Sequence, residues 1–150
     1  MTPEARAAFD AAVRILAGRA HGRTELRRKL AQRKHGSSDI GVAFERLEEL
    51  GYLEEEADLA QRYAGELARR RGATPRAVAH KLRERGFAED LSARAVDHAF
   101  EGWNPREAAL QAVQGETDPE KAARKLTRKG FTTDAVVWVV GRLRSRREDQ

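Results

Sequence analysis

Apolar side chains recur along this chain at spacings of three and four residues, which places them on one face of an α-helix. The first such stripe holds Phe9, Val13 and Leu16 and predicts a helix over about residues 3–19. No stretch alternates apolar and polar residues for long enough to form a half-buried strand. The pattern therefore predicts an all-α protein.

Eight more stripes follow, and glycines such as Gly51, Gly72, Gly86 and Gly102 fall where stripes end, as expected for helix C-termini. The stripes are Leu26 and Leu30; Ile40, Phe44, Leu47 and Leu50; Leu59, Tyr63 and Leu67; Val78 and Leu82; Leu91, Ala95, Ala99 and Phe100; Leu110 and Val113; Ala122 and Leu126; and Val136, Val139, Val140 and Leu143.

All four prolines follow a residue that caps helices well. The pairs are Thr2-Pro3, Thr74-Pro75, Asn104-Pro105 and Asp118-Pro119. A short polar side chain accepts bonds from the free N–H groups of the first turn, and proline at the next position lacks an N–H that would have no partner. Each pair therefore predicts a helix start.

The stripes repeat in three rounds with periods of roughly 44–52 residues, which is typical of stacked helical units. Equivalent positions hold Lys29-Leu30, Lys81-Leu82 and Lys125-Leu126; Asp39, Asp90 and Asp134; and Gly86-Phe87 and Gly130-Phe131, with Gly36 as a looser match. We expect three three-helix repeats over residues 1–51, 52–102 and 103–150, in an elongated array, straight or curved. Tyr52 and Trp103 fall at the junctions, where we expect them to pack.

The composition shows an excess of basic over acidic residues. The chain has 150 residues, 29 Lys and Arg, 24 Asp and Glu and a net charge of +5, which favours acidic partners or nucleic acid. It has no cysteine, so disulfides and thiolate chemistry are excluded. The start is neither a signal peptide nor a membrane span, and we expect a cytoplasmic monomer without a membrane partner.

The middle helix of each predicted unit carries two cations four residues apart around its leucine. Like charges at this spacing destabilise a helix by about 0.2–0.5 kcal/mol, so their recurrence suggests a shared use. The stacked units could align them into one basic strip, which binds an anionic partner. Cations near helix C-termini also interact favourably with the helix dipole, so a solvated face is the alternative. The strip comprises Arg28, Lys29, Arg33, His80, Lys81, Arg85, Arg124, Lys125 and Lys129, flanked by Arg27, Arg70 and Arg76.

Other candidate chemistry is weak. Carboxylates crowd the first junction, but Glu54–Glu56 would open a helix, where acids favour the dipole. The four histidines lack metal-ligand spacing, and no nucleophile elbow or phosphate-binding glycine loop is present. We expect no catalytic residue, metal or cofactor. Trp138 lies in the apolar segment Val136–Val140, which is either core or partner surface.

Three segments together resemble the RecX family, the bacterial regulators of the RecA recombinase. They are ILAGRAHGRTELRRKL at 15–30, LEELGYLEEEADLAQRYAGELARRRG at 47–72, and the two later Lys-Leu…Gly-Phe repeats. The resemblance covers about residues 13–143. The family often has Asp where this chain has Glu54 and Glu55, and an aromatic residue at Leu59, which leaves the fold untouched but bears on the partner surface.

The resemblance implies an array of three-helix units that lies in the groove of the RecA–DNA filament. There the family limits filament growth and inhibits ATP hydrolysis, strand exchange and coprotease activity without being an enzyme, in the context of DNA repair, recombination and the SOS response. From the residues alone two alternatives stay open. One is a helical-repeat protein that grips single- or double-stranded DNA directly through phosphates, and the other is a helical scaffold for another protein.

Overall fold

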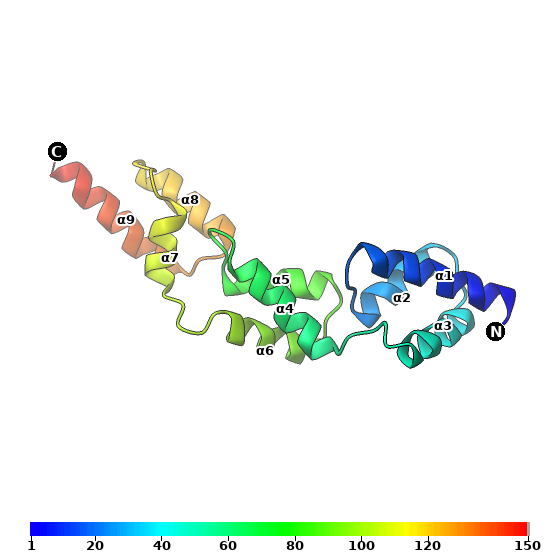
Figure 1. Cartoon of the computed structure of the whole chain (residues 1–150). Coiled ribbons are helices and arrows are strands. Elements are labelled where there is room, and N and C mark those ends of the chain that lie inside the picture. Colours follow the sequence, from blue (N-terminus) through cyan, green and yellow to red (C-terminus); the bar gives the residue numbers. More distant parts are fainter. Residues whose placement is uncertain (150) are drawn as a thin grey trace.

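The computed structural model describes residues 1–149, and all regular elements within them are α-helices (Figure 1). The all-α prediction is confirmed. The helices are α1 (Pro3–Gly18), α2 (Arg23–Gln32), α3 (Ser37–Glu49), α4 (Glu56–Ala68), α5 (Pro75–Glu84), α6 (Glu89–Ala99), α7 (Pro105–Ala112), α8 (Pro119–Lys129) and α9 (Thr133–Glu148).

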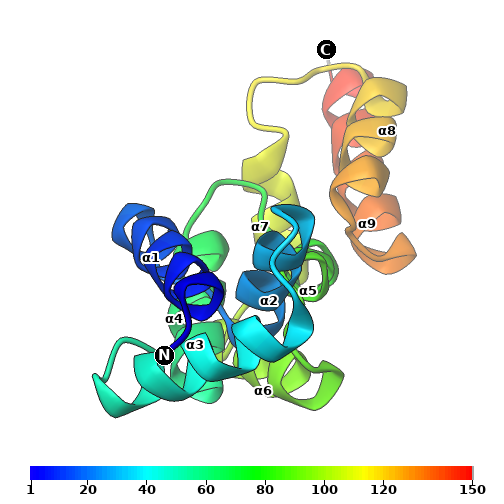
Figure 2. The same cartoon turned by 90° about the vertical axis from the view of Figure 1, so that its right-hand side faces the viewer.

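Three separate hydrophobic cores divide these helices into three units. Leu26, Leu30 and Leu47 lie fully buried in the core of α1–α3. Leu82 is buried in that of α4–α6, and Leu126 in that of α7–α9. The units follow one another along a long molecule whose two ends carry the chain termini (Figure 1). Seen after a quarter turn, α8 and α9 stand to one side of the first unit, so the array is not straight (Figure 2).

The proline pairs do what their chemistry predicts. The side chains of Thr2, Thr74, Asn104 and Asp118 each accept a hydrogen bond from a backbone N–H in the first turn of α1, α5, α7 and α8. In each of these four helices proline occupies the first turn. Four of the nine helix starts in residues 1–149 are therefore correctly predicted by a capping residue followed by proline.

Alanine, rather than the larger stripe residues, lines the buried face of α1. Ala5, Ala8 and Ala12 are at most 2% exposed, whereas Phe9 and Val13 are half-buried at the edge of the core. A methyl side chain lets a neighbouring helix approach closely, so α1 and α3 pack along their length. The most buried residues, Ala8 and Ala12, thus directly precede the predicted stripe residues Phe9 and Val13.

The end of α2 corrects one predicted equivalence. Gly86 and Gly130 follow α5 and α8 with φ of +84° and +98°, and the same position after α2 holds Lys34 with φ of +68°. The next residue's N–H bonds the carbonyl of Leu30, Leu82 or Leu126 in all three turns. Gly36 is therefore not the equivalent glycine: it precedes α3 in extended conformation.

The two junction aromatics behave differently. Trp103 stacks on Phe131 with 6.1 Å between ring centroids and meets the edge of Phe100 at 5.4 Å, so it packs between the second and third units as predicted. Tyr52 is 52% exposed, and its predicted junction packing is wrong. Gly22, the turn residue before α2, lies against Phe87 and Glu56 of the second unit, so the first two units contact each other there without Tyr52.

Helix α9 settles the question that its apolar segment raised. Val139 is fully buried, while Val137 is 64% exposed and Trp138 is half-buried. The guanidinium groups of Arg142 and Arg106 lie 4.9 and 5.8 Å from the centroid of the Trp138 ring. The segment is therefore core on one side and surface on the other.

Candidate anion-binding surface on the middle helices

The middle helices α2, α5 and α8 are joined head to tail across the unit junctions. At the second junction the Thr74 hydroxyl, which caps α5, donates a hydrogen bond of 2.7 Å to the carbonyl of Lys129 at the end of α8. A Cβ on Gly130 would lie 2.8 Å from Thr74 Oγ1, so the absence of a side chain there permits the contact. The C-terminus of α8 thus meets the N-terminus of α5.

The first junction repeats this arrangement. Arg28 on α2 donates a bond of 3.2 Å to the carbonyl of Glu84 at the end of α5, and a Cβ on Gly86 would lie 2.9 Å from Thr24 Cγ2. The Glu56 carboxylate at the start of α4 accepts from the Arg23 backbone N–H and so caps α2 from the neighbouring unit. We call α2, α5 and α8 the helix row; Figure 1 shows them one after another along the molecule.

Charge is segregated onto this row. From N-cap to C-cap the three helices span residues 22–33, 74–85 and 118–130 and hold fourteen Lys and Arg against four Asp and Glu. The rest of the chain therefore holds fifteen basic and twenty acidic residues. The net positive charge of the protein is entirely a property of the row.

Nearly all Lys and Arg side chains of the row lack a carboxylate partner within residues 1–149. Among residues 1–149, Arg23 is the one member of the fourteen that pairs with a carboxylate, that of Glu48 at 3.2 Å. The other arginines in ion pairs lie on the first and third helices of the units or at their ends, and they are Arg6, Arg19, Arg46, Arg62, Arg94 and Arg106. Carboxylates thus compensate the flanks and leave the row charged.

One groove brings several predicted residues together. It has a volume of about 610 Å³, lies between α5 and α8, and is lined by Arg76, His80, Lys81 and Lys129 of the predicted basic strip. Arg83 and Arg128 also line it, and so does one acid, Glu84, whose carboxylate lies 2.8 Å from His80 Nε2. Sequence reasoning missed Arg128, although it follows Lys125 by three residues and so shares a helix face with it.

Lys29 and Arg33 line a different groove. It has a volume of about 420 Å³ between α1 and α2, and Arg19, His21 and Gln32 also line it. The three Lys-Leu motifs therefore occupy equivalent positions in their units without opening into one continuous cleft.

Two members of the predicted basic strip take structural positions. The Arg85 guanidinium lies 4.1 Å from the centroid of the Tyr63 ring. The Lys129 ammonium lies within 2.8 Å of where a Cβ on Gly72 would be, so its side chain crosses the second junction. The remaining members Arg27, Arg70, Arg124 and Lys125 are exposed, Arg27 with its guanidinium 4.1 Å from the centroid of the Phe44 ring.

A buried polar cluster, missed in the sequence, anchors the base of α2. Arg19 donates to both carboxylate oxygens of Glu25 at 3.0 and 2.9 Å. His21 Nδ1 lies 2.9 Å from the Arg19 carbonyl, an acceptor, so Nδ1 carries the hydrogen and Nε2 accepts from Lys29 Nζ at 2.7 Å. His21 and Glu25 are each 5% exposed. His21, Glu25 and Lys29 are spaced by four residues, and this spacing is the sequence signal from which the cluster could have been predicted.

Burial and neighbours shift the pKa values of this cluster. Burial, with the positive charges of Arg19 and Lys29, lowers the pKa of His21 below its ordinary value. Burial and the surrounding guanidinium groups also lower the pKa of Lys29. Burial raises the pKa of Glu25, but the hydrogen bonds from Arg19 and the positive charges of Arg19 and Arg85 together outweigh it, so the pKa of Glu25 is lowered. Neutral His21 is thus the form that the fold selects.

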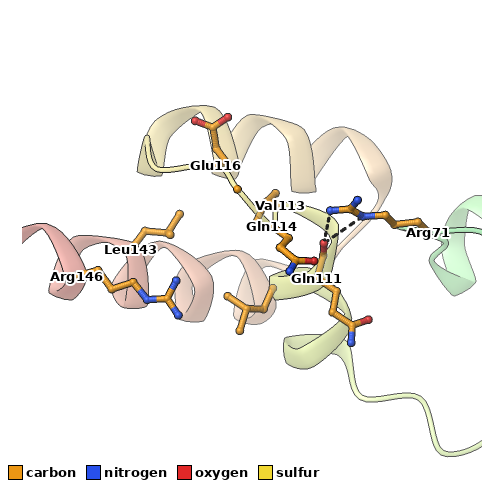
Figure 3. Close-up of a pocket in the computed structure, with 9 residues that line it drawn as sticks. Arg71, Gln111, Val113, Gln114, Glu116, Leu143 and Arg146 are labelled. Atoms are coloured by element: carbon orange, nitrogen blue, oxygen red, sulfur yellow. Dashed lines mark hydrogen bonds between the residues drawn. The ribbon is translucent and has the colours of Figure 1, made fainter.

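A further hollow of about 540 Å³ lies at the second junction, away from the helix row's cationic groove. Leu110, Val113 and Leu143 form its apolar floor, and Arg71 and Arg146 reach it from opposite sides (Figure 3). Arg71 donates bonds of 3.3 and 2.9 Å to the carbonyl of Gln111 near the end of α7. Its guanidinium is therefore engaged in joining the units.

Other kinds of site find little support in the described part of the chain. Residues 1–149 contain no group of three or more His, Asp or Glu side chains placed to hold a metal ion. Within the same residues no helix combines the length and apolarity that a bilayer span requires.

Fold and surface together define a class of protein, a three-unit helical array with one row of uncompensated positive charge. The chain belongs to the RecX family. The family description "RecX, first three-helix domain" matches residues 8–47. A regulatory protein RecX from Halorhodospira halophila is 34% identical over 85% of this chain and 82% of its own length. One from Chlorobaculum tepidum is 32% identical over 79% of this chain and 74% of its own.

The fold is shared with a solved relative. The crystal structure of RecX from Lactobacillus salivarius superposes with a TM-score of 0.72, covering 95% of this chain and 98% of that chain at 16% sequence identity. At this identity the likeness concerns the fold, and it agrees with the three-unit array described above.

Proposed function

We propose that this protein is a non-enzymatic regulator of the RecA recombinase, which lies along the RecA–DNA filament and places the helix row against it. Bound there, it limits filament growth and lowers ATP hydrolysis, strand exchange and coprotease activity. Membership of a family whose relatives are named regulatory proteins supports the regulatory role. A cytoplasmic place in DNA repair, recombination and the SOS response follows from that role.

The observation that carries the proposal is the segregation of charge onto the row. Thirteen of its fourteen cations lack a carboxylate partner within residues 1–149, although the rest of the chain holds an excess of acids. A face whose Lys and Arg side chains are left mostly without carboxylate partners attracts a partner with negative potential over a length of several helices. A DNA–protein filament supplies such a partner through its phosphates and acidic side chains.

The test is an ATPase assay of RecA on single-stranded DNA with increasing amounts of this protein. We expect hydrolysis to fall with the wild-type chain, and to fall much less with Arg76→Glu, Lys81→Glu and Arg128→Glu combined, because these changes invert the α5–α8 groove. The matched control reverses Arg94, a cation of α6 that already pairs with Asp90. Unchanged hydrolysis at excess wild-type protein would rule the proposal out.

Direct binding to single- or double-stranded DNA is the second candidate, and the same unpaired cations favour it. A protein that neutralises phosphates releases counterions, so its affinity falls steeply with salt. A gel shift without RecA distinguishes the two. Tight, strongly salt-dependent binding together with unaffected RecA hydrolysis would favour the DNA-binding protein.

A further inference from the structure

The exposed large apolar side chains of residues 1–149 lie on the first and last units and in the linker after the first unit. Val42, Leu50 and Tyr52 are 40, 41 and 52% exposed on and after α3, and Val137 is 64% exposed on α9. Met1 is the remaining large apolar residue of this kind in residues 1–149, and none lies in the middle unit α4–α6. In Figure 1 α3 and α9 occupy opposite ends of the array. Apart from Tyr52 in the linker between α3 and α4, exposed apolar surface of this kind in residues 1–149 thus lies on the two outer units.

The helices α3 and α9 of the two outer units carry opposite charge. Helix α3, residues 37–49, holds four Asp and Glu against one Arg. Residues 138–149, the second half of α9, hold four Arg against two acids. Within residues 1–149 none of these four arginines, Arg142, Arg144, Arg146 and Arg147, forms an ion pair.

The face of α9 has the form of a helix-docking groove. A hollow of about 540 Å³ is lined by Val137, Trp138, Gly141, Arg142, Ser145, Arg146 and Asp149. A Cβ on Gly141 would meet nothing within 4 Å, so the backbone there is open to close approach. The Arg142 and Arg106 guanidinium groups lie 4.9 and 5.8 Å from the centroid of the half-buried Trp138 ring, so cations already occupy its π-face. This groove therefore suits an apolar side chain better than a stacked nucleobase.

The outer face of α3 has matching chemistry. Three of its exposed residues, Val42, Glu45 and Glu49, are spaced by three and four and so share one face of the helix. Leu50, the next residue, is also exposed. The apolar members of this face would contact Val137 and Trp138. The Glu45 carboxylate, which forms no ion pair within residues 1–149, would face Arg142 and Arg146, and Glu49 would exchange its present partner Arg46, at 3.0 Å, for one of them.

We propose that copies of this chain associate end to end, with the α3 face of one copy seated on the α9 groove of the next. The contact is heterologous, because two different surfaces meet, so it extends into a line of copies rather than closing as a dimer. It is small and therefore weak in dilute solution, where the chain stays monomeric. Copies held side by side on one filament would have a high effective concentration, and the contact would then make their binding cooperative.

Sedimentation velocity of the protein alone tests the proposal independently of RecA. At low salt we expect the weight-average sedimentation coefficient to rise with concentration from the micromolar to the millimolar range. Gly141→Leu fills the groove without a clash, and the matched control Gly65→Leu makes the same change on α4, where an added Cβ meets only Arg69 at 3.9 Å. Self-association should weaken about tenfold or more in the first variant and stay unchanged in the second.

Mixing two blocked variants tests the polarity of the contact. One carries Val42→Asp and Leu50→Asp and has lost the α3 face, and the other is Gly141→Leu. Neither should self-associate, yet their mixture should form a heterodimer that grows no further, because one intact surface of each kind is left. A chain that stays monomeric at millimolar concentration, or a Val42→Asp/Leu50→Asp variant that associates like wild type, would overturn the proposal.

Discussion

The Thr74 hydroxyl accepts a hydrogen bond from the N–H of Ala77 and donates one of 2.7 Å to the carbonyl of Lys129, 55 residues further along the chain. One side chain thus begins α5 and fastens α8 to it. Thr74 is fully buried, so its oxygen cannot exchange these partners for water.

Replacing Thr74 by alanine should lower the free energy of unfolding by about 2–3 kcal/mol, because a helix cap is lost and the Lys129 carbonyl loses a buried donor. Thr132→Ala is the matched control, since Thr132 caps α9 and makes no bond across a junction. It should destabilise by about 1 kcal/mol. Urea denaturation followed by circular dichroism measures both, and equal losses would show that the cross-junction bond contributes nothing.

Lys34→Gly should stabilise the protein by about 0.5–1 kcal/mol. Lys34 is exposed with φ of +68°, a left-handed conformation that is unfavourable for side chains and that Gly86 and Gly130 adopt at the equivalent positions. Gly51→Ala provides the converse, because a Cβ there meets nothing within 4 Å while φ is +72°. It should destabilise by a similar amount, and a thermal melt of the two variants checks the signs.

Trp103→Ala should cost about 2–3 kcal/mol, because it empties the aromatic stack between Phe100 and Phe131. Tyr52→Ala, the change at the position equivalent in sequence, should stay within about 0.5 kcal/mol because the side chain is 52% exposed. Equal effects in denaturant unfolding would mean that Tyr52 packs in solution.

Stability should fall as the pH drops below about 6.5, the ordinary pKa of histidine. Because burial lowers the pKa of His21 in the fold, the unfolded chain binds more protons between the two pKa values, and acid favours unfolding there. Glu25, whose pKa is also lowered, adds a second loss below about 4.5. His21→Gln should flatten the upper part of the profile, whereas His98→Gln, on an exposed side chain, should leave it unchanged.

Binding through the helix row should be salt-dependent in proportion to the cations engaged. Replacing Lys81 and Arg128 by glutamine should reduce the slope of log affinity for DNA against log salt by about one for each lost phosphate contact. Arg94→Gln should leave the slope unchanged, since Arg94 lies on α6 outside the row. Fluorescence anisotropy of labelled DNA over a salt series provides the slopes, and identical slopes would place the DNA elsewhere.

Much of the fold could be predicted because its signals are local. A capping residue before each proline marks four helix starts, and the leucines Leu30, Leu82 and Leu126 set the register of the three units. Lys34 shows where local reading fails. The helix end and the packing of the unit impose its left-handed turn. Because no glycine marks this position, the repeat pattern predicted the nearby Gly36 as the equivalent residue instead.

The site could be predicted in outline only. Sequence spacing identified the three basic middle helices, but it could not show that helix ends meet in a row or that acids neutralise the flanks. Arg85 and Lys129 match the other cations by spacing, yet one covers Tyr63 and the other crosses the second junction. The cluster of His21 and Glu25 depends on an arginine from the preceding turn, a contact that tertiary packing creates.

Three independent cores joined by helix tips have a mechanical consequence. Each unit keeps its own buried interior. The units are joined by polar links such as Thr74 to Lys129 and Arg28 to Glu84, and at the second junction also by the stack of Trp103 on Phe131. We therefore expect the array to bend at these two junctions before any of its three cores opens.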